Sequence, residues 1–151
     1  MITGLAAREA ALQMLYALDL DRGAQTAREV AHWYLQAHPL PAAAAARAQE
    51  LVAAVEQQRG EIERLISKHA VGWRLERMSV VDRNVLKLAT AEFLLAPQAA
   101  ARTAIQPARK LAQKFSQPEA VQFIQGLLEA IARDLASPSP TPAEVAPHAE
   151  S

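Results

Sequence analysis

The residues from Ser79 to Pro97 read SVVDRNVLKLATAEFLLAP and carry the signals of one well-bounded helix. Ser79 and Asp82 form an N-terminal capping pattern, because the serine hydroxyl can accept a hydrogen bond from the backbone N–H three residues later. Apolar residues then recur at helical spacing, at Val81, Val85, Leu88 and Leu95. The helix is predicted to stop before Pro97, because the residue that precedes a proline disfavours the helical conformation.

Helical patterns also fill the sequence before this stretch. Residues 3–21 contain no turn signal and are apolar almost all the way round, which is typical of a helix that packs on more than one side. Thr26 and Glu29 have the spacing of a capping box and open a second helix. A third helix is predicted from about Ala42 to His69, despite Gly60.

Two more helices are predicted after Pro97. The first runs from Thr103 to Phe115, with Pro107 placed in its first turn, where the missing N–H costs little. The second begins at Pro118, and its apolar stripe consists of Val121, Ile124, Leu128, Ile131 and Leu135. At about 100° per residue, Phe123 falls roughly 110° from the centre of that stripe. A phenylalanine in this position calls for a role outside the core.

Six or seven helices with short connections, and no convincing strand, predict an all-α bundle. The length of 151 residues fits one domain, which we expect to span residues 1–136. The segment SPSPTPAEVAPHAES, residues 137–151, is a Pro-rich tail with few apolar residues to bury, and we expect it to be disordered.

Composition excludes several classes of protein. The chain has no cysteine, which excludes disulfide frameworks and Cys-based zinc sites and fits a cytoplasmic location. The longest uncharged stretch, Val30 to Ala46, contains histidines and prolines and so is not a membrane span. No charged residue other than Arg102, Arg109, Lys110 and Lys114 lies between Glu92 and Glu119, and this basic zone is either a solvated helix face or a nucleic-acid contact.

The sequence gives no indication of an enzyme, a cofactor or a metal site. It has no Gly-rich phosphate loop, no pair of histidines one helical turn apart and no nucleophile elbow. Glu76 and Asp82 are better explained as a surface charge and a helix cap than as an acid/base pair. His69 lies on an apolar stripe without a second ligand nearby, so we interpret it as a buried or capping histidine.

Three segments together resemble the NusB family of bacterial transcription antitermination factors. The central one contains Trp73, Leu75-Glu76-Arg77, Val81-Asp82-Arg83, Val85-Leu86-Lys87-Leu88-Ala89, Glu92 and Leu94-Leu95, close to the family pattern W-x-L-E-R-L-x-x-V-D-R-x-I-L-R-L-A-x-x-E-L-L. REAALQMLY, from Arg8 to Tyr16, resembles the first helix of the family, and LAQKFSQPEAVQFIQGLLEAI resembles its last segments. The likeness covers Arg8 to about Ile131, in order, and leaves out the tail.

This resemblance implies a fold of two three-helix bundles and a non-enzymatic role in RNA binding. Members of the family pair with NusE, a small-subunit ribosomal protein, and bind the boxA element of nascent RNA, so that RNA polymerase in the antitermination complex resists termination on ribosomal RNA operons. The resemblance assigns RNA contacts to Phe123, Gln122, Tyr16 and Arg8. It places four more residues near the same surface: Glu76, Asp82, Phe115 and Glu119. Capping, packing or a solvated loop would explain those four equally well.

The sequence departs from the family pattern where RNA contacts are expected. Family members commonly begin with a run of arginines, whereas this chain begins MITGLAAREA, with Arg8 alone. The I-N-E of the family is Ile105-Gln106-Pro107 here, and its Gly, Ser and Asn are Ser116, Ala120 and Gln125. Two alternatives therefore stay open. One is a protein–protein adaptor or drifted paralogue that has lost RNA specificity, and the other is a targeting module acting in trans for an rRNA methyltransferase.

Overall fold

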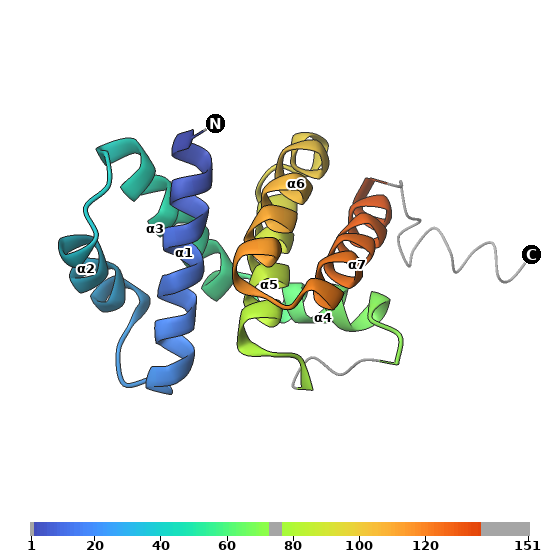
Figure 1. Ribbon diagram of the computed structural model, residues 1–151, viewed down its shortest axis with the longest axis horizontal. Helices are drawn as coiled ribbons and strands as arrows, with labels where there is room; N and C mark the ends of the chain where they lie inside the picture. The colour runs from blue at the N-terminus through green and yellow to red at the C-terminus, as the bar shows by residue number, and fades with distance from the viewer. Residues whose placement is uncertain (1, 73–76, 137–151) are drawn as a thin grey trace, which may run out of the picture.

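The computed structural model describes residues 2–72 and 77–136, without the side chains of residues 2–3 and 99–102. The described residues form seven α-helices and no strand (Figure 1), which confirms the all-α prediction. The helices are α1 (Ile2–Asp21), α2 (Ala27–Ala37), α3 (Ala42–Gln57), α4 (Arg59–His69), α5 (Val80–Leu95), α6 (Pro97–Phe115) and α7 (Pro118–Ala136). The predicted tail and Glu76 lie outside the described residues.

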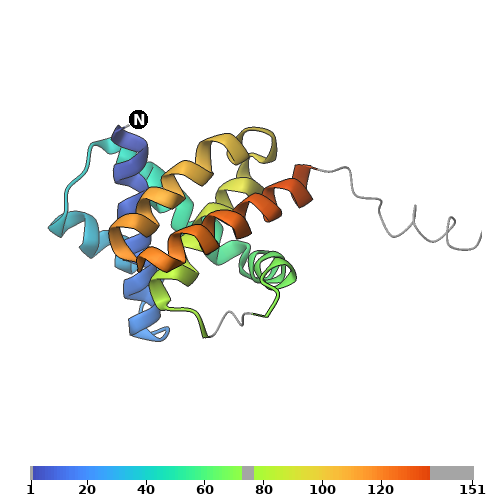
Figure 2. The ribbon, with the colours of Figure 1, turned by 45° about the vertical axis from the view of Figure 1, so that its right-hand side comes forward.

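The helices form two groups that meet at α5. Helices α1, α2 and α3 all contact one another, and so do α5, α6 and α7, with α4 lying against α5 and α7. Figures 1 and 2 show the first group on one side of the molecule and the second on the other. Both α1 and α3 also pack on α5, so the two predicted three-helix bundles share one core.

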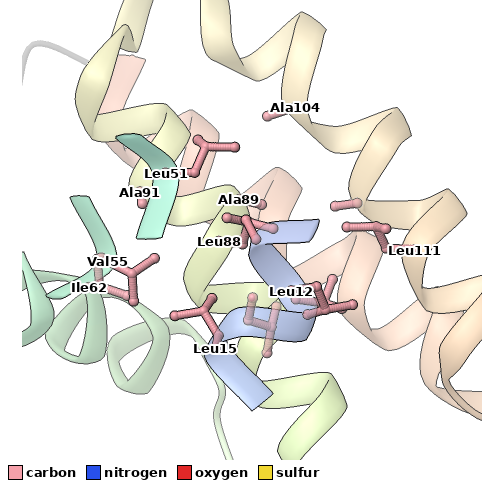
Figure 3. Packing of buried hydrophobic residues seen from close by; sticks show 14 of the residues in the cluster. Leu12, Leu15, Leu51, Val55, Ile62, Leu88, Ala89, Ala91, Ala104 and Leu111 are labelled. Carbon is pink, nitrogen blue, oxygen red and sulfur yellow. The ribbon is translucent and has the colours of Figure 1, made fainter. Parts of the chain in front are cut away.

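Helix α5 is buried on every side along most of its length. All ten residues from Asn84 to Phe93 are buried, because neighbouring helices surround them. Side chains of α1, α3, α4 and α6 converge there (Figure 3), and the labelled ones are Leu12, Leu15, Leu51, Val55, Ile62, Leu88, Ala89, Ala91, Ala104 and Leu111. Full burial of one leucine-sized side chain contributes about 1.5–3 kcal/mol, so this shared core supplies much of the stability of the fold.

The predicted caps are confirmed. The Ser79 hydroxyl accepts a hydrogen bond from the N–H of Asp82 at 3.0 Å, where α5 begins. Thr26 and Glu29 form a complete capping box, with distances of 3.1 and 2.8 Å. The predicted stop before Pro97 is also confirmed, since α5 ends at Leu95.

Two predicted helix boundaries are wrong. The single helix predicted over residues 42–69 is broken at Gln58, whose φ and ψ of −105° and 21° end α3 and begin α4. Gly60 lowers the helix propensity beside this break, and α4 then turns to cover α5 and α7. Helix α6 begins at Pro97, six residues earlier than predicted, so Pro107 lies in its interior and not in its first turn.

Candidate nucleic-acid interface

A first surface hollow lies between α1, α5 and α6. It measures about 220 Å³, and its lining residues are Leu12, Gln13, Tyr16, Val81, Asn84 and Phe115. Tyr16 is 41% exposed, and the ring of Phe115 is half-buried. The structure thus brings together Tyr16, for which the resemblance implied an RNA contact, and Phe115, which it placed near the same surface, although 99 positions separate them in the chain.

A second hollow lies between the beginnings of α5 and α7. It measures about 410 Å³, and its lining residues are Arg77, Met78, Ser79, Asp82, Gln117, Glu119, Ala120 and Phe123. Glu119 is exposed on its rim, and Gln122, which precedes Phe123 in the sequence, is also exposed. Phe123 is half-buried and packs partly against the core, so its ring is less separate from the core than the sequence pattern suggests.

The two hollows are joined at the first turn of α5. Val81 lines the first hollow and Asp82 lines the second. The Asp82 carboxylate accepts a hydrogen bond from the hydroxyl of Ser116, the residue that follows Phe115 at the end of α6. We call this combined area the two-hollow surface. It contains Tyr16, Asp82, Phe115, Glu119 and Phe123, whereas Gln122 lines neither hollow.

Arg8 does not line either hollow. Its Nε and Nη2 donate to the two carboxylate oxygens of Glu92, at 2.7 and 2.6 Å. Only 14% of the Arg8 side chain and 4% of the Glu92 side chain are exposed. The guanidinium is therefore held inside the molecule by a bidentate ion pair.

Positive charge near the two-hollow surface comes from scattered side chains of the described residues, and Arg77, which lines the second hollow, is exposed. Nζ of Lys114 lies 5.3 Å from the centre of the Phe115 ring and 3.0 Å from a carboxylate oxygen of Glu9. Lys110 is exposed, whereas Nε of Arg109 is buried and has no hydrogen-bond partner among the described residues. Of the predicted basic zone, the described side chains of Arg109, Lys110 and Lys114 thus differ in exposure and pairing.

Sequence reasoning missed two amides of the first hollow. Gln13 lies one helical turn before Tyr16, and that spacing alone would have placed both on one face of α1. Asn84 is 2% exposed and donates through Nδ2 to Asp19 at 2.8 Å. No pattern in the sequence indicated that Asn84 lines this hollow, because its position there depends on how α1 packs on α5.

The described residues show neither a metal-binding cluster nor a membrane-spanning helix. No group of three or more His, Asp or Glu side chains among them could hold a metal ion. His69 hydrogen-bonds through Nε2 to Asp134 at 2.8 Å and so links α4 to α7. Within the described part of the chain, no helix combines the length and the apolar character needed to cross a membrane.

Comparison with known sequences gives a consistent result. A model of the NusB family matches residues 5–133. The transcription antitermination protein NusB of Koribacter versatilis (strain Ellin345) is 40% identical over 128 residues, which cover 85% of this chain and 87% of the relative. The protein of the same name from Myxococcus xanthus (strain DK1622) is 35% identical over 133 residues, covering 87% and 95%. These relatives carry the names of transcription factors and not of enzymes, as expected from the sequence.

Solved structures with the same fold include RNA complexes. A chain in the crystal structure of a plectonemic RNA supercoil is 29% identical, with a TM-score of 0.82, and the match covers 92% of this chain and all of that one. A chain in the crystal structure of the antitermination factors NusB and NusE in complex with dsRNA is 25% identical, with a TM-score of 0.79, covering 89% and 98%.

Proposed function

The chain belongs to the NusB family of transcription antitermination proteins, and we propose that it binds boxA RNA of ribosomal RNA operons together with NusE. In this role it joins the RNA polymerase antitermination complex in the bacterial cytoplasm, where nascent RNA is made. The family match covers residues 5–133, and the resemblance drawn from the sequence motifs is confirmed.

The observation that best supports RNA binding is the two-hollow surface. Sequence-specific RNA readers take unpaired bases whose faces stack on aromatic rings, and each such contact contributes about 1–3 kcal/mol. Tyr16, Phe115 and Phe123 come from three different helices and line adjoining hollows. Gln122, the residue before Phe123, is exposed and offers an amide for hydrogen bonds to base edges.

The scattered positive charge near the two hollows indicates that NusE is needed for RNA binding. Phosphate contacts supply most of the sequence-independent affinity for nucleic acid, and among the described residues the cations near the two hollows are scattered, with Arg77 in the second hollow and Lys114 held by Glu9 beside the first. We infer that NusE supplies part of the phosphate contacts. The solved complex of related NusB and NusE proteins with dsRNA supports an assembly of this composition.

The test is fluorescence anisotropy with labelled boxA RNA, with and without NusE. Single-stranded boxA, the same sequence as a duplex, and a scrambled single strand are compared. We expect the tightest binding for single-stranded boxA with NusE present. Binding of NusE without any preference for boxA would instead identify a protein–protein adaptor.

A pair of variants on α1 makes the test specific to the surface. Tyr16→Ala removes a ring that lines the first hollow, while Leu20→Ala removes an apolar side chain that is 64% exposed and lines neither hollow. The proposal requires that only the Tyr16 variant loses RNA affinity, by roughly 1–3 kcal/mol. Equal affinities of the two variants would contradict it.

A further inference from the structure

The Arg8 guanidinium donates to two acceptors of the same chain, the buried carboxylate of Glu92 and a backbone carbonyl at the surface. Its pair with Glu92 is bidentate, with N–O distances of 2.7 and 2.6 Å, and both side chains are largely excluded from water. Bidentate arginine–carboxylate pairs fix geometry as well as energy. Nη2 also donates to the backbone carbonyl of Thr103 in α6, at 3.2 Å.

The second acceptor lies where Pro107 alters α6. In a regular helix, the N–H of residue 107 would donate to the carbonyl oxygen of residue 103. Proline has no N–H, and Pro107 lies in the interior of α6. Pro107 cannot donate to the carbonyl oxygen of Thr103, and Arg8 does so instead. This hydrogen bond links α1 to α6.

Neighbouring residues hold the guanidinium in this position. A Cβ on Gly4, one turn earlier in α1, would lie only 3.0 Å from Nη1 of Arg8, so the glycine leaves room for the arginine. Arg47 of α3 also approaches Glu92, with 3.6 Å between Nη2 and Oε1. Glu92 on α5 thus joins α1 and α3, and Arg8 extends the connection to α6.

A phosphate would have to compete with these two intramolecular acceptors. Removing the guanidinium from Glu92 would leave a buried carboxylate without its closest partner, which is strongly unfavourable. Tyr16 lies eight residues further along α1, about 12 Å at 1.5 Å per residue, so a helix fixed at Arg8 also fixes Tyr16.

We propose that Arg8 is a positioning residue: through Glu92 and the Thr103 carbonyl it sets the register of α1 on α5 and α6, and thereby holds Tyr16 at the first hollow, without itself contacting RNA. This inference rests on the proposed RNA-binding function. It replaces the phosphate contact that the family resemblance implied for Arg8.

Arg8→Lys, Arg8→Gln and Glu92→Gln separate the two roles. Lysine keeps the positive charge but cannot reproduce the bidentate pair. Arg64→Gln is the matched control, because Arg64 forms a bidentate pair with Glu61 at 2.9 and 2.7 Å that is exposed and lines neither hollow. Affinity for boxA RNA with NusE is measured at several salt concentrations, at a temperature where circular dichroism shows each variant folded.

We expect Arg8→Lys and Glu92→Gln each to weaken RNA binding about tenfold with an unchanged salt slope. For Glu92→Gln this loss is expected even though the variant removes a negative charge, because Glu92 is buried and acts through Arg8. Arg8→Gln, if it folds, should behave in the same way. A phosphate contact at Arg8 would instead leave the lysine variant close to wild type, lower the salt slope of Arg8→Gln by about 0.7, and leave Glu92→Gln unaffected. Either pattern decides the question, even if the glutamine variant does not fold.

A measurement on the RNA-free protein keeps this inference separate from the proposed function. The NMR resonances of the Tyr16 ring should shift in Arg8→Lys and Glu92→Gln but not in Arg64→Gln. Unchanged Tyr16 resonances and unchanged RNA affinity, with only a lower melting temperature, would reduce Arg8 to a stabilising role and overturn the proposal. If wild type fails to bind boxA RNA even with NusE, the proposed function is wrong, and the Tyr16 resonances still report on the register of α1.

Discussion

His69 and Asp134 join the last turns of α4 and α7 across 65 positions of sequence, with 2.8 Å between Nε2 and Oδ2. Lys68 reaches the same carboxylate oxygen at 2.9 Å. The hydrogen bonds from Lys68 and then His69 hold the pKa of Asp134 below its usual range. The two helices are thus linked by a carboxylate that is stabilised in its charged form.

This link predicts an acid-dependent loss of stability. Because the pKa of Asp134 is lower in the folded than in the unfolded chain, its contribution is complete above the ordinary Asp value of about 4, and is lost as pH falls through the lower folded value. Urea unfolding of wild type and Asp134→Asn should therefore differ most near neutral pH and converge below about pH 4. A difference that grows on acidification would contradict this assignment.

Phe123 should contribute to both RNA binding and stability. Its ring lines the second hollow yet packs partly on the core, so the role outside the core that the sequence pattern indicated is not its only one. We expect Phe123→Leu to weaken RNA binding by about 1–3 kcal/mol and to lower the free energy of unfolding by less than about 1.5 kcal/mol. Phe93→Leu, in the buried core of α5, should show the opposite pattern, with a loss of stability and normal RNA affinity.

Removing the guanidinium that pairs with Glu92 should lower the free energy of unfolding strongly. Arg8→Met leaves a carboxylate that is 4% exposed without its bidentate partner, which typically costs about 3–5 kcal/mol. Arg64→Met removes an exposed pair and should cost no more than about 1 kcal/mol. The comparison is made by chemical denaturation of both variants, and similar losses would show that burial does not govern the Arg8 pair.

The N-terminal segment contains Arg8 as its single arginine, which predicts that RNA binding depends on NusE. The protein alone should bind boxA RNA weakly, with a shallow salt slope, and NusE should raise the affinity at least about tenfold, or roughly 1.4 kcal/mol. Each arginine introduced between Met1 and Ala7 that reaches a phosphate should steepen the slope by about 0.7 and strengthen binding without NusE. Tight, steeply salt-dependent binding by the unmodified protein alone would refute this prediction.

Local signals predicted the helices well, because caps and stops act within one turn. Ser79 opened α5 as expected, and Pro97 ended it. The break at Gln58 carried no comparable signal, since Val55 and Ile62 are seven residues apart and so keep the same helix face across it. Pro107 was misplaced because the tolerance of a proline inside α6 depends on neighbouring helices that sequence spacing does not reveal.

The candidate site was predicted only in part, for the same physical reason. Tyr16, Phe115 and Phe123 were selected by their resemblance to family motifs, and the packing of α1, α5, α6 and α7 places them in adjoining hollows. Arg8 was selected on the same basis, but its partner Glu92 lies 84 positions away in the sequence. Pairing over that distance is a property of the tertiary fold, so an internal ion pair and a phosphate contact look alike in the sequence.

The burial of α5 from Asn84 to Phe93 also governs how the molecule opens. Backbone amides exchange with solvent through local opening where contacts are few, and only through global unfolding where an element is enclosed. Helix α2 packs against α1 and α3 at one edge of the molecule (Figure 1), so its amide protons should exchange by local fraying. Those of α5 cannot reach water until both groups of helices separate, which makes the two halves a single cooperative unit.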